Sequence, residues 1–246
     1  MKCLILAAGY ATRLYPLTEN FPKSLLKVQD KTILDWLVDD IDTANAIDQY
    51  VIISNHKFYD IFVEWAKTKS QNIVVIDDGT TSNDNRLGAV KDIQFAIESL
   101  KLDDDMLVIA GDNVLDFSLT EFVFYAKEKK TSCVMRYYEE HKEKLKKSGV
   151  LTISCTDRVL KMSEKPQEPE SNWCCPPFYF YTKEDSKKIP VAIQDGANTD
   201  APGSYIAWLC KQTTVHAMEM KGKRYDIGNL ESYKQVQTEY KGINKK

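Results

Sequence analysis

Short apolar runs alternate with segments of helical period from Lys2 to about Met135. Compact runs rich in Val, Ile and Leu are typical of buried strands. We expect such strands at Cys3 to Ala8, Tyr50 to Ser54, Ile73 to Ile76, Met106 to Ile109 and Ser132 to Tyr137. Between them, apolar residues recur at helical spacing. This alternation predicts βαβ units and a parallel sheet covered by helices on both faces.

Three amphipathic helices are expected in this half of the chain. Each is predicted by apolar residues that fall on one helical face, which we interpret as core packing. The three faces are formed by Leu34, Leu37, Ile41 and Ala44, by Phe58, Ile61, Phe62 and Trp65, and by Leu87, Val90, Ile93, Ile97 and Leu100.

The pattern loosens after Gly149, where further strands predict an antiparallel extension of the sheet. A loop is indicated by Gly, Asn and Pro, and the chain closes on a helix and a Lys-rich tail. The expected segments are strands at Val150 to Ser154, Val159 to Met162 and Trp173 to Tyr181, a helix beginning near Glu184, a loop over Gln194 to Gly203, a strand at Val215 to Met220 and a helix at Leu230 to Tyr240.

Composition limits the partners of the chain. Its 246 residues include 33 basic and 36 acidic side chains, so the net charge is -3. Binding to bulk nucleic acid or to an anionic membrane needs a surplus of Lys and Arg, and we expect neither partner. No apolar run approaches the roughly 20 residues of a membrane span, and no signal peptide is recognised, which predicts a cytoplasmic protein. The six cysteines lack CxxC spacing and are expected to be reduced.

The segment after the first predicted strand carries the most informative motif, Ala7-Ala8-Gly9-Tyr10-Ala11-Thr12-Arg13, with Lys23 farther along. Small residues after a buried strand allow backbone N–H groups to approach a phosphate, and Arg13 and Lys23 add positive charge to it. The segment matches neither the Walker A loop nor GxGxxG. It predicts a triphosphate site; the alternative is an ordinary turn with two surface cations.

Two acidic residues follow strands far apart in the sequence, Asp112 in Gly111-Asp112-Asn113 and Asp226 in Tyr225-Asp226-Ile227-Gly228. Ligands bind at the carboxyl ends of strands in α/β sheets, so two convergent carboxylates would form a Mg²⁺ site. The alternative is that each Asp only caps the helix that follows it.

A third motif, Ser163-Glu164-Lys165-Pro166, ends a predicted strand. Lys165 offers a cation for a substrate phosphate, and Glu164 offers a carboxylate for hydroxyl groups. The alternative is a charged turn. The three histidines lie outside every motif, and we interpret them as structural or surface residues.

These motifs follow one order along the chain: LAAGYATRL with PKSLL, then GDN, then SEKPQEPESNW, and then YDIGN. Together they resemble the sugar-1-phosphate nucleotidylyltransferase family over roughly Lys2 to Tyr233, and most of all its thymidylyl and uridylyl members that act on glucose 1-phosphate. The resemblance implies a Rossmann-like α/β fold: a mostly parallel twisted sheet with helices on both faces and a small antiparallel extension on the substrate side. We expect one domain over 1–246, with a nucleotide-binding half (1–135), a sugar-phosphate-binding half (136–228) and a C-terminal helix and tail (229–246).

The resemblance also implies roles for single residues. The reaction would transfer a nucleoside monophosphate from a pyrimidine nucleoside triphosphate to a sugar 1-phosphate, with Mg²⁺ as cofactor and pyrophosphate as product. The implied catalytic residues are Arg13, Lys23, Asp112, Lys165 and Asp226; Asp112 and Asp226 bind the metal; Ala7, Ala8, Gly9, Asn83 and Gly88 join Arg13, Lys23 and Asp112 at the nucleotide; Gly149, Glu164, Lys165 and Cys175 bind the sugar phosphate.

Several points stay open at this level. Ala11 replaces the second glycine of the family's loop, and Asn83 is shorter than the glutamine usual in thymidylyl enzymes. The choice among dTTP, UTP and CTP, the sugar and the oligomeric state are therefore not predicted. Two other functions fit part of the pattern: a cytidylyltransferase acting on a non-sugar phosphate such as phosphocholine, and a non-catalytic module that binds nucleotide sugars.

Overall fold

A computed structural model describes residues 1–244 of the chain. Its backbone forms two compact units, and each unit combines segments that are distant in sequence. Unit 1 contains Met1–Arg86, Ala110–Glu121 and the segment that begins at Lys221, and unit 2 contains Leu87–Ile109 and Phe122–Met220. Part of the predicted Lys-rich tail, Lys245 and Lys246, lies outside the described residues.

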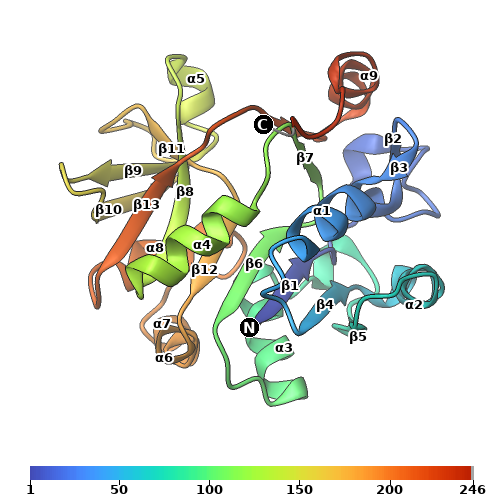
Figure 1. Cartoon of the computed structure of the whole chain (residues 1–246), viewed down its shortest axis with the longest axis horizontal. Helices are drawn as coiled ribbons and strands as arrows, with labels where there is room; N and C mark the ends of the chain where they lie inside the picture. Colours follow the sequence, from blue (N-terminus) through green and yellow to red (C-terminus); the bar gives the residue numbers. More distant parts are fainter. Residues whose placement is uncertain (245–246) are drawn as a thin grey trace. The chain divides into compact units, whose positions relative to one another are not determined.

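Unit 1 is built on three parallel strands in the order β1 (Lys2–Leu6), β4 (Gln49–Ser54) and β5 (Ile73–Asp77). Ile5 lies opposite Ile52, which in turn lies opposite Val75. Both faces of β1 and β4 are buried, which explains their continuous apolar runs. The three strands predicted from those runs are present, although the first ends at Leu6 and not at Ala8. Figure 1 shows them in blue and cyan.

Helices of unit 1 bury the predicted faces. In α1 (Ile33–Asp42) the face that includes Leu34, Leu37 and Ile41 is buried, and α2 (Tyr59–Lys67) packs against β4 and β5. A capping box in which Thr32 and Asp35 bond each other's backbone starts α1. Short 3₁₀ turns lie at η1 (Thr12–Leu14), η2 (Lys23–Leu25), η3 (His56–Phe58) and η4 (Asn83–Asn85).

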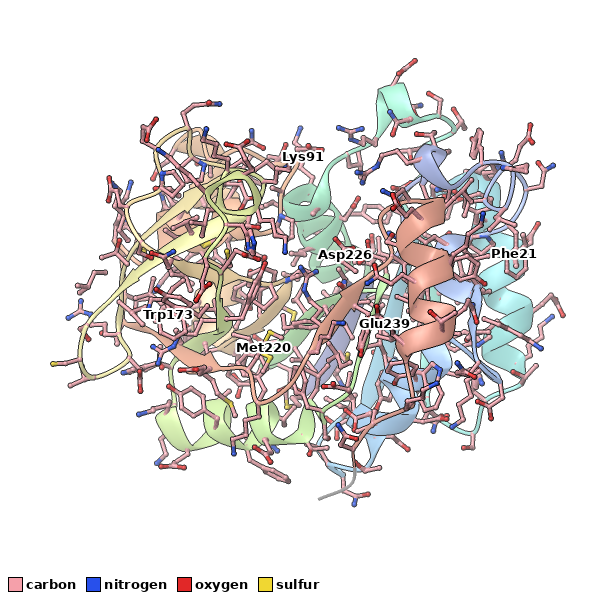
Figure 2. All side chains as sticks on the ribbon, turned by 90° about the horizontal axis from the view of Figure 1, so that it is seen from above. Phe21, Lys91, Trp173, Met220, Asp226 and Glu239 are labelled. Carbon is pink, nitrogen blue, oxygen red and sulfur yellow. The ribbon has the colours of Figure 1, made fainter. Side chains whose placement is uncertain are left out.

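Two small antiparallel ladders of unit 1 were not predicted. In one of them β7 (Asn113–Leu115) pairs with β14 (Arg224–Asp226), and in the other β2 (Lys27–Val28) pairs with β3 (Lys31–Thr32). Such strands are too short to carry a hydrophobic alternation. Helix α9 (Leu230–Glu239) packs against β14, and Figure 2 labels Asp226 and Glu239 on these two elements.

Unit 2 has a largely antiparallel sheet in the order β10-β9-β11-β8-β12-β6, with β13 parallel to β8. The antiparallel extension expected after Gly149 is therefore confirmed. The strands are β6 (Met106–Ala110), β8 (Ser132–Tyr138), β9 (Gly149–Ile153), β10 (Val159–Glu164), β11 (Trp173–Cys175), β12 (Phe178–Tyr181) and β13 (Val215–Glu219). The helices α3 (Ala89–Leu100), α5 (Lys142–Leu145), α6 (Lys183–Ser186), α7 (Ile189–Gln194) and α8 (Gly203–Leu209) also belong to unit 2, and α4 spans Thr120–Lys129.

Two predictions in this half were wrong. The single strand over Trp173 to Tyr181 is two strands, because Pro176 and Pro177 have no N–H for a ladder. Gly203 does not end the loop that precedes it but begins α8.

All six cysteines are free thiols. Within residues 1–244, none of the helices is both long and apolar enough to cross a membrane.

Candidate functional site

The loop after β1 exposes backbone donors. Its start is fixed where Ala7 N–H donates to the Ile53 carbonyl and the Asn55 amide donates to the Ala8 carbonyl, each at 2.9 Å. The Tyr10 hydroxyl donates to the Thr80 carbonyl. From Ala8 to Ala11, no backbone N–H donates a hydrogen bond to any group of the described chain. A run of free N–H groups is an anion-binding feature, as the motif predicted.

Gly9 and Ala11 differ in what the fold demands of them. Gly9 is exposed, has no left-handed φ, and a Cβ there would meet nothing within 4 Å. The fold therefore gives no steric reason for glycine at this position. Ala11 has φ 48° and ψ 41°, the left-handed conformation that favours glycine, and its carbonyl accepts from the Thr18 hydroxyl at 2.8 Å. The loop thus has, at Ala11, a backbone conformation that is typical of glycine.

Lys23 and Asp112 form the central ion pair of unit 1, with 2.7 Å between Lys23 Nζ and Asp112 Oδ2. Only 12% of the Lys23 side chain is exposed, against 36% for Asp112. Gly111 sets the position of Asp112: its N–H donates to the Leu6 carbonyl, and a Cβ there would lie 2.9 Å from the Ser24 hydroxyl. The backbone before Asp112 thus packs closely against the end of β1.

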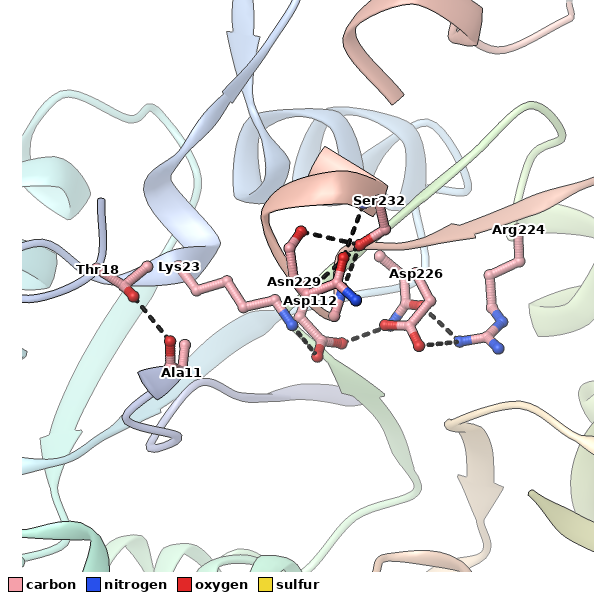
Figure 3. Close-up of polar contacts among 10 residues, drawn as sticks. Ala11, Thr18, Lys23, Asp112, Arg224, Asp226, Asn229 and Ser232 are labelled. Carbon is pink, nitrogen blue, oxygen red and sulfur yellow. Dashed lines mark hydrogen bonds and ion pairs between the residues drawn. The ribbon is translucent and has the colours of Figure 1, made fainter. Parts of the chain in front are cut away.

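A polar chain continues from this pair toward Asp226 (Figure 3). The Asn113 amide donates to Asp112 Oδ1 at 2.6 Å, and the Arg224 guanidinium donates to Asn113 Oδ1 at 2.7 Å. Arg224 also lies 3.9 Å from Asp226 Oδ2. The β7–β14 ladder places Asp226 opposite Asn113, and Ile227 N–H donates to the Asp112 carbonyl. The two predicted metal ligands therefore belong to one network.

The chemistry of this network fits a hard divalent cation. Asp112 and Asp226 supply two carboxylates with partly exposed side chains, of 36% and 53%. Mg²⁺ is commonly held by one or two carboxylates together with water and substrate phosphate. No cluster of three or more His, Cys, Asp or Glu side chains suited to a metal occurs in the described part of the chain.

The predicted base-binding residues lie in different units. Asn83 is in unit 1, exposed, and its side-chain oxygen accepts from Arg86 at 3.1 Å. Gly88 is in unit 2 with φ 91°, and a Cβ there would lie 2.6 Å from the Thr199 carbonyl oxygen. Backbone packing and backbone conformation therefore require glycine at this position, whatever its role toward a base.

In unit 2, sheet pairing brings Gly149 next to both Glu164 and Cys175. The Glu164 carboxylate is half-buried, and it has no hydrogen bond or ion pair with any described residue. Burial raises the pKa of Glu164, and the nearby Lys165 ammonium opposes that rise. A carboxylate in this state is an acceptor that a ligand's hydroxyl groups can satisfy.

Lys165 follows Glu164 in a left-handed conformation, with φ 47°. Its N–H donates to the Ser148 carbonyl at 3.0 Å, which ties the turn to the start of β9. The ammonium group is exposed and pairs with no carboxylate among residues 1–244. Non-glycine residues in this conformation often cluster at functional sites.

Arg13 and the histidines complete the comparison with the sequence. Arg13 is exposed and makes no ion pair within the described residues. His56 pairs with Asp77 at 2.6 Å, and His216 contacts Thr131, consistent with surface and structural roles. Sequence reasoning missed Asn113 and Arg224, although Asn113 stands inside the GDN motif.

Known proteins similar to this chain decide its family. A family model described as nucleotidyl transferase matches residues 2–242. The chain belongs to the nucleotidyl transferase family. Two curated relatives are a UTP–glucose-1-phosphate uridylyltransferase, AglF, from Haloferax volcanii (24% identical) and a bifunctional protein GlmU from Methanocaldococcus jannaschii (28% identical). Each alignment covers 93% of this transferase, with 91% of AglF and 51% of GlmU, so the chain spans about half the length of the second relative.

Solved structures share the fold of this chain. The transferase superposes on UDP-glucose pyrophosphorylase with a TM-score of 0.80, both for a complex with UDP-glucose and for the apo form. The identities are 20% and 21%, and 96% of each chain is covered. At these identities the likeness concerns the fold, and it confirms the predicted Rossmann-like α/β class.

Replacing Ala11 with glycine is expected to raise the free energy of unfolding by about 0.5–1 kcal/mol. Relief of the left-handed strain should exceed the extra backbone entropy that glycine loses on folding. Urea unfolding would measure it. Ala197→Gly is the matched control, because Ala197 is also a half-buried loop alanine but has no positive φ, so glycine should destabilise it. Equal losses at both positions would contradict the strain assigned to Ala11.

Proposed function

We propose that this nucleotidyl transferase transfers a nucleoside monophosphate from a nucleoside triphosphate to a sugar 1-phosphate. The observation that carries the proposal is the row of free N–H groups at Ala8 to Ala11 in a chain of this family. A triphosphate carries the negative charge that such a loop binds. The sugar phosphate is suggested by relatives named for glucose 1-phosphate and by the unpaired Glu164 carboxylate, which suits hydroxyl donors.

The reaction is a direct displacement at phosphorus. An oxygen of the sugar 1-phosphate attacks the α-phosphorus, the bond from that phosphorus to the bridging oxygen breaks, and pyrophosphate leaves with the bond's electrons. A phosphate monoester oxygen is already nucleophilic at neutral pH, so the protein need not supply a nucleophile. Its contribution is to position the two substrates and to neutralise charge.

On the nucleotide side, N–H groups at Ala8 and Gly9 would bind phosphate oxygens, and Arg13 and Lys23 would neutralise them. Asp112 and Asp226 would hold Mg²⁺, which when bound spreads the negative charge of the triphosphate. Lys23 pairs with Asp112 in the structure, and with Mg²⁺ held by Asp112 its ammonium would neutralise a phosphate instead.

On the acceptor side, Lys165 would bind the sugar phosphate, and Glu164 would accept hydroxyl hydrogen bonds. Gly149 lies beside Glu164, and Cys175 lies on the other side of Gly149. Phosphocholine, the acceptor in the alternative function, offers no hydroxyl to Glu164. This disfavours a cytidylyltransferase of that kind.

For the base we propose a pyrimidine, with Asn83 and Gly88 as its contacts. Two hydrogen bonds, from backbone at Gly88 and from the Asn83 amide, suffice for the compact edge of a pyrimidine. Cytoplasmic location, the absence of nucleic-acid and membrane partners, and the choice between monomer and homo-oligomer stay at the level of the sequence expectations.

A substrate matrix tests the proposed function. Four or five nucleoside triphosphates are combined with several sugar 1-phosphates and phosphocholine, and pyrophosphate release is measured with Mg²⁺ and with EDTA. We expect release with a pyrimidine triphosphate and a sugar 1-phosphate, and none in EDTA. Equal use of ATP or GTP would refute only the base assignment. A lack of pyrophosphate release with every sugar 1-phosphate would refute the function.

Asp112→Asn and Asp226→Asn are each expected to lower kcat by at least about 10²-fold, because each removes a charge that binds the metal. Asp226→Asn should leave the fold intact, since 53% of its side chain is exposed. Asp112→Asn also removes the counter-charge of the nearly buried Lys23 ammonium, so urea unfolding of this variant is measured beside its kinetics. Asp195→Asn is the control: Asp195 contacts Trp208 in unit 2, outside every proposed site. A normal rate for Asp226→Asn at saturating Mg²⁺ would exclude it as a ligand.

Acid should weaken binding of the sugar phosphate. Ionised Glu164 accepts hydroxyl hydrogen bonds best, and burial places the pKa of this carboxyl above its ordinary 4.5. As the pH falls through that raised pKa, Glu164 takes up a proton and KM for the sugar phosphate should rise. The substrate's own phosphate also titrates, near about pH 6. Glu164→Gln keeps the titration of the substrate phosphate and should lose the part of the pH dependence that comes from Glu164. Identical pH profiles for the two enzymes would count against a role of Glu164.

A further inference from the structure

Gly203, the first residue of α8, lies buried at one side of the Glu164 carboxylate in unit 2. No motif pointed to it, and its φ is not left-handed, so backbone conformation does not require glycine there. The reason for glycine must therefore be steric.

A side chain at this position would collide with two side-chain ends. A Cβ on Gly203 would lie 2.5 Å from Glu164 Oε2, 2.4 Å from Met162 Cε and 3.5 Å from the Tyr179 hydroxyl. Separations below 3.0 Å force a movement, and the atoms that can move here are the flexible ends of Glu164 and Met162.

The backbone of the segment before Gly203 has little freedom to move away. Ala89 N–H donates to the Asp200 carbonyl, and Val90 N–H donates to the Thr199 carbonyl. These bonds tie the segment to the start of α3. On the other side of Gly203, Ser204 N–H donates back to the Ala201 carbonyl at 3.1 Å, and α8 packs on β10, the strand that carries Glu164.

Gly149 flanks the same carboxylate from β9. A Cβ there would lie 3.1 Å from Glu164 Oε2 and 2.5 Å from Met162 Cε. Two glycines from separate elements thus surround one unpaired carboxylate. If Gly203 served only to pack α8 closely, this would not explain why Gly149 lies against the same Glu164 oxygen.

We propose that Gly203 is a specificity-determining residue: by lacking a side chain, it fixes where the Glu164 carboxylate lies and keeps it open to the hydroxyl groups of the sugar phosphate. The proposal rests on the proposed function. It commits to an acceptor with free ring hydroxyls, because an unpaired carboxylate offers its oxygens to hydrogen-bond donors.

The test is the kinetics of Gly203→Ala, with the triphosphate and the best sugar 1-phosphate of the wild type varied in turn. We expect KM for the sugar phosphate to rise at least about tenfold, and KM for the triphosphate to stay within about twofold, because the displaced group contacts only the acceptor. Ser204→Ala is the matched control on the same helix; its buried hydroxyl has no partner within the described chain, and its kinetics should be unchanged.

Two double variants distinguish displacement of Glu164 from crowding at Met162. Gly203→Ala in a Glu164→Ala background should add no further loss, since residues that act through one contact are not additive. Gly203→Ala with Met162→Ala removes the crowding at the methionine, which keeps the test usable if the single variant does not fold. The loss should persist there, because the collision with Glu164 remains.

Each outcome has one meaning. A wild-type enzyme that is inactive with every sugar phosphate refutes the proposed function and this inference with it. An active wild type with an unchanged sugar KM in Gly203→Ala refutes the inference alone. Additive losses in the Glu164→Ala background, or full recovery with Met162→Ala, would also overturn it.

Discussion

The ion pair between Lys23 and Asp112 is the interaction on which the candidate nucleotide site depends. A nearly buried ammonium needs a counter-charge, and removing one partner of such a pair leaves the other uncompensated. The two residues are 89 positions apart in sequence, so the pair fixes the turn after the first strand against the GDN segment. Asn113, Arg224 and Asp226 then follow in one hydrogen-bonded and charged chain.

This arrangement explains how such a site works without a nucleophilic side chain. The loop from Ala8 to Ala11 offers backbone donors, and Lys23 and Arg13 add positive charge. Glu164 and Lys165 in unit 2 offer an acceptor and a cation for the second substrate. In the proposed function all of these groups would bind substrate or neutralise charge. Catalysis would then rest on the positioning of two substrates and on charge neutralisation.

Residue periodicity predicted the long elements of the fold but not the small ones. Buried strands such as β1 and β4 are read from their apolar runs, and the small residues after β1 indicated free backbone donors. The three-residue ladder of β7 and β14 carries no such pattern, so the placing of Asp226 beside Asn113 follows only from the folded chain. The hydrogen bond from Arg224 to Asn113 could not be predicted either, because Arg224 lies in the same short ladder.

Conformation and packing set the other limits of the sequence reading. Lys165 and Ala11 adopt left-handed backbone conformations, which their residue types do not predict. Gly203 was predicted to be the last residue of a loop, whereas it packs against the carboxylate of Glu164, nearly forty positions earlier in the chain. Such roles arise from contacts between distant segments, which spacing along one sequence cannot reveal.

Isotope exchange between labelled pyrophosphate and the nucleoside triphosphate tests the central claim, that the reaction is a direct displacement without transfer to the protein. Direct displacement needs both substrates, so we predict no exchange without a sugar 1-phosphate and exchange once a competent one is added. Exchange with the triphosphate alone would mean that a nucleotidyl group is transferred to the protein itself, and would contradict the account.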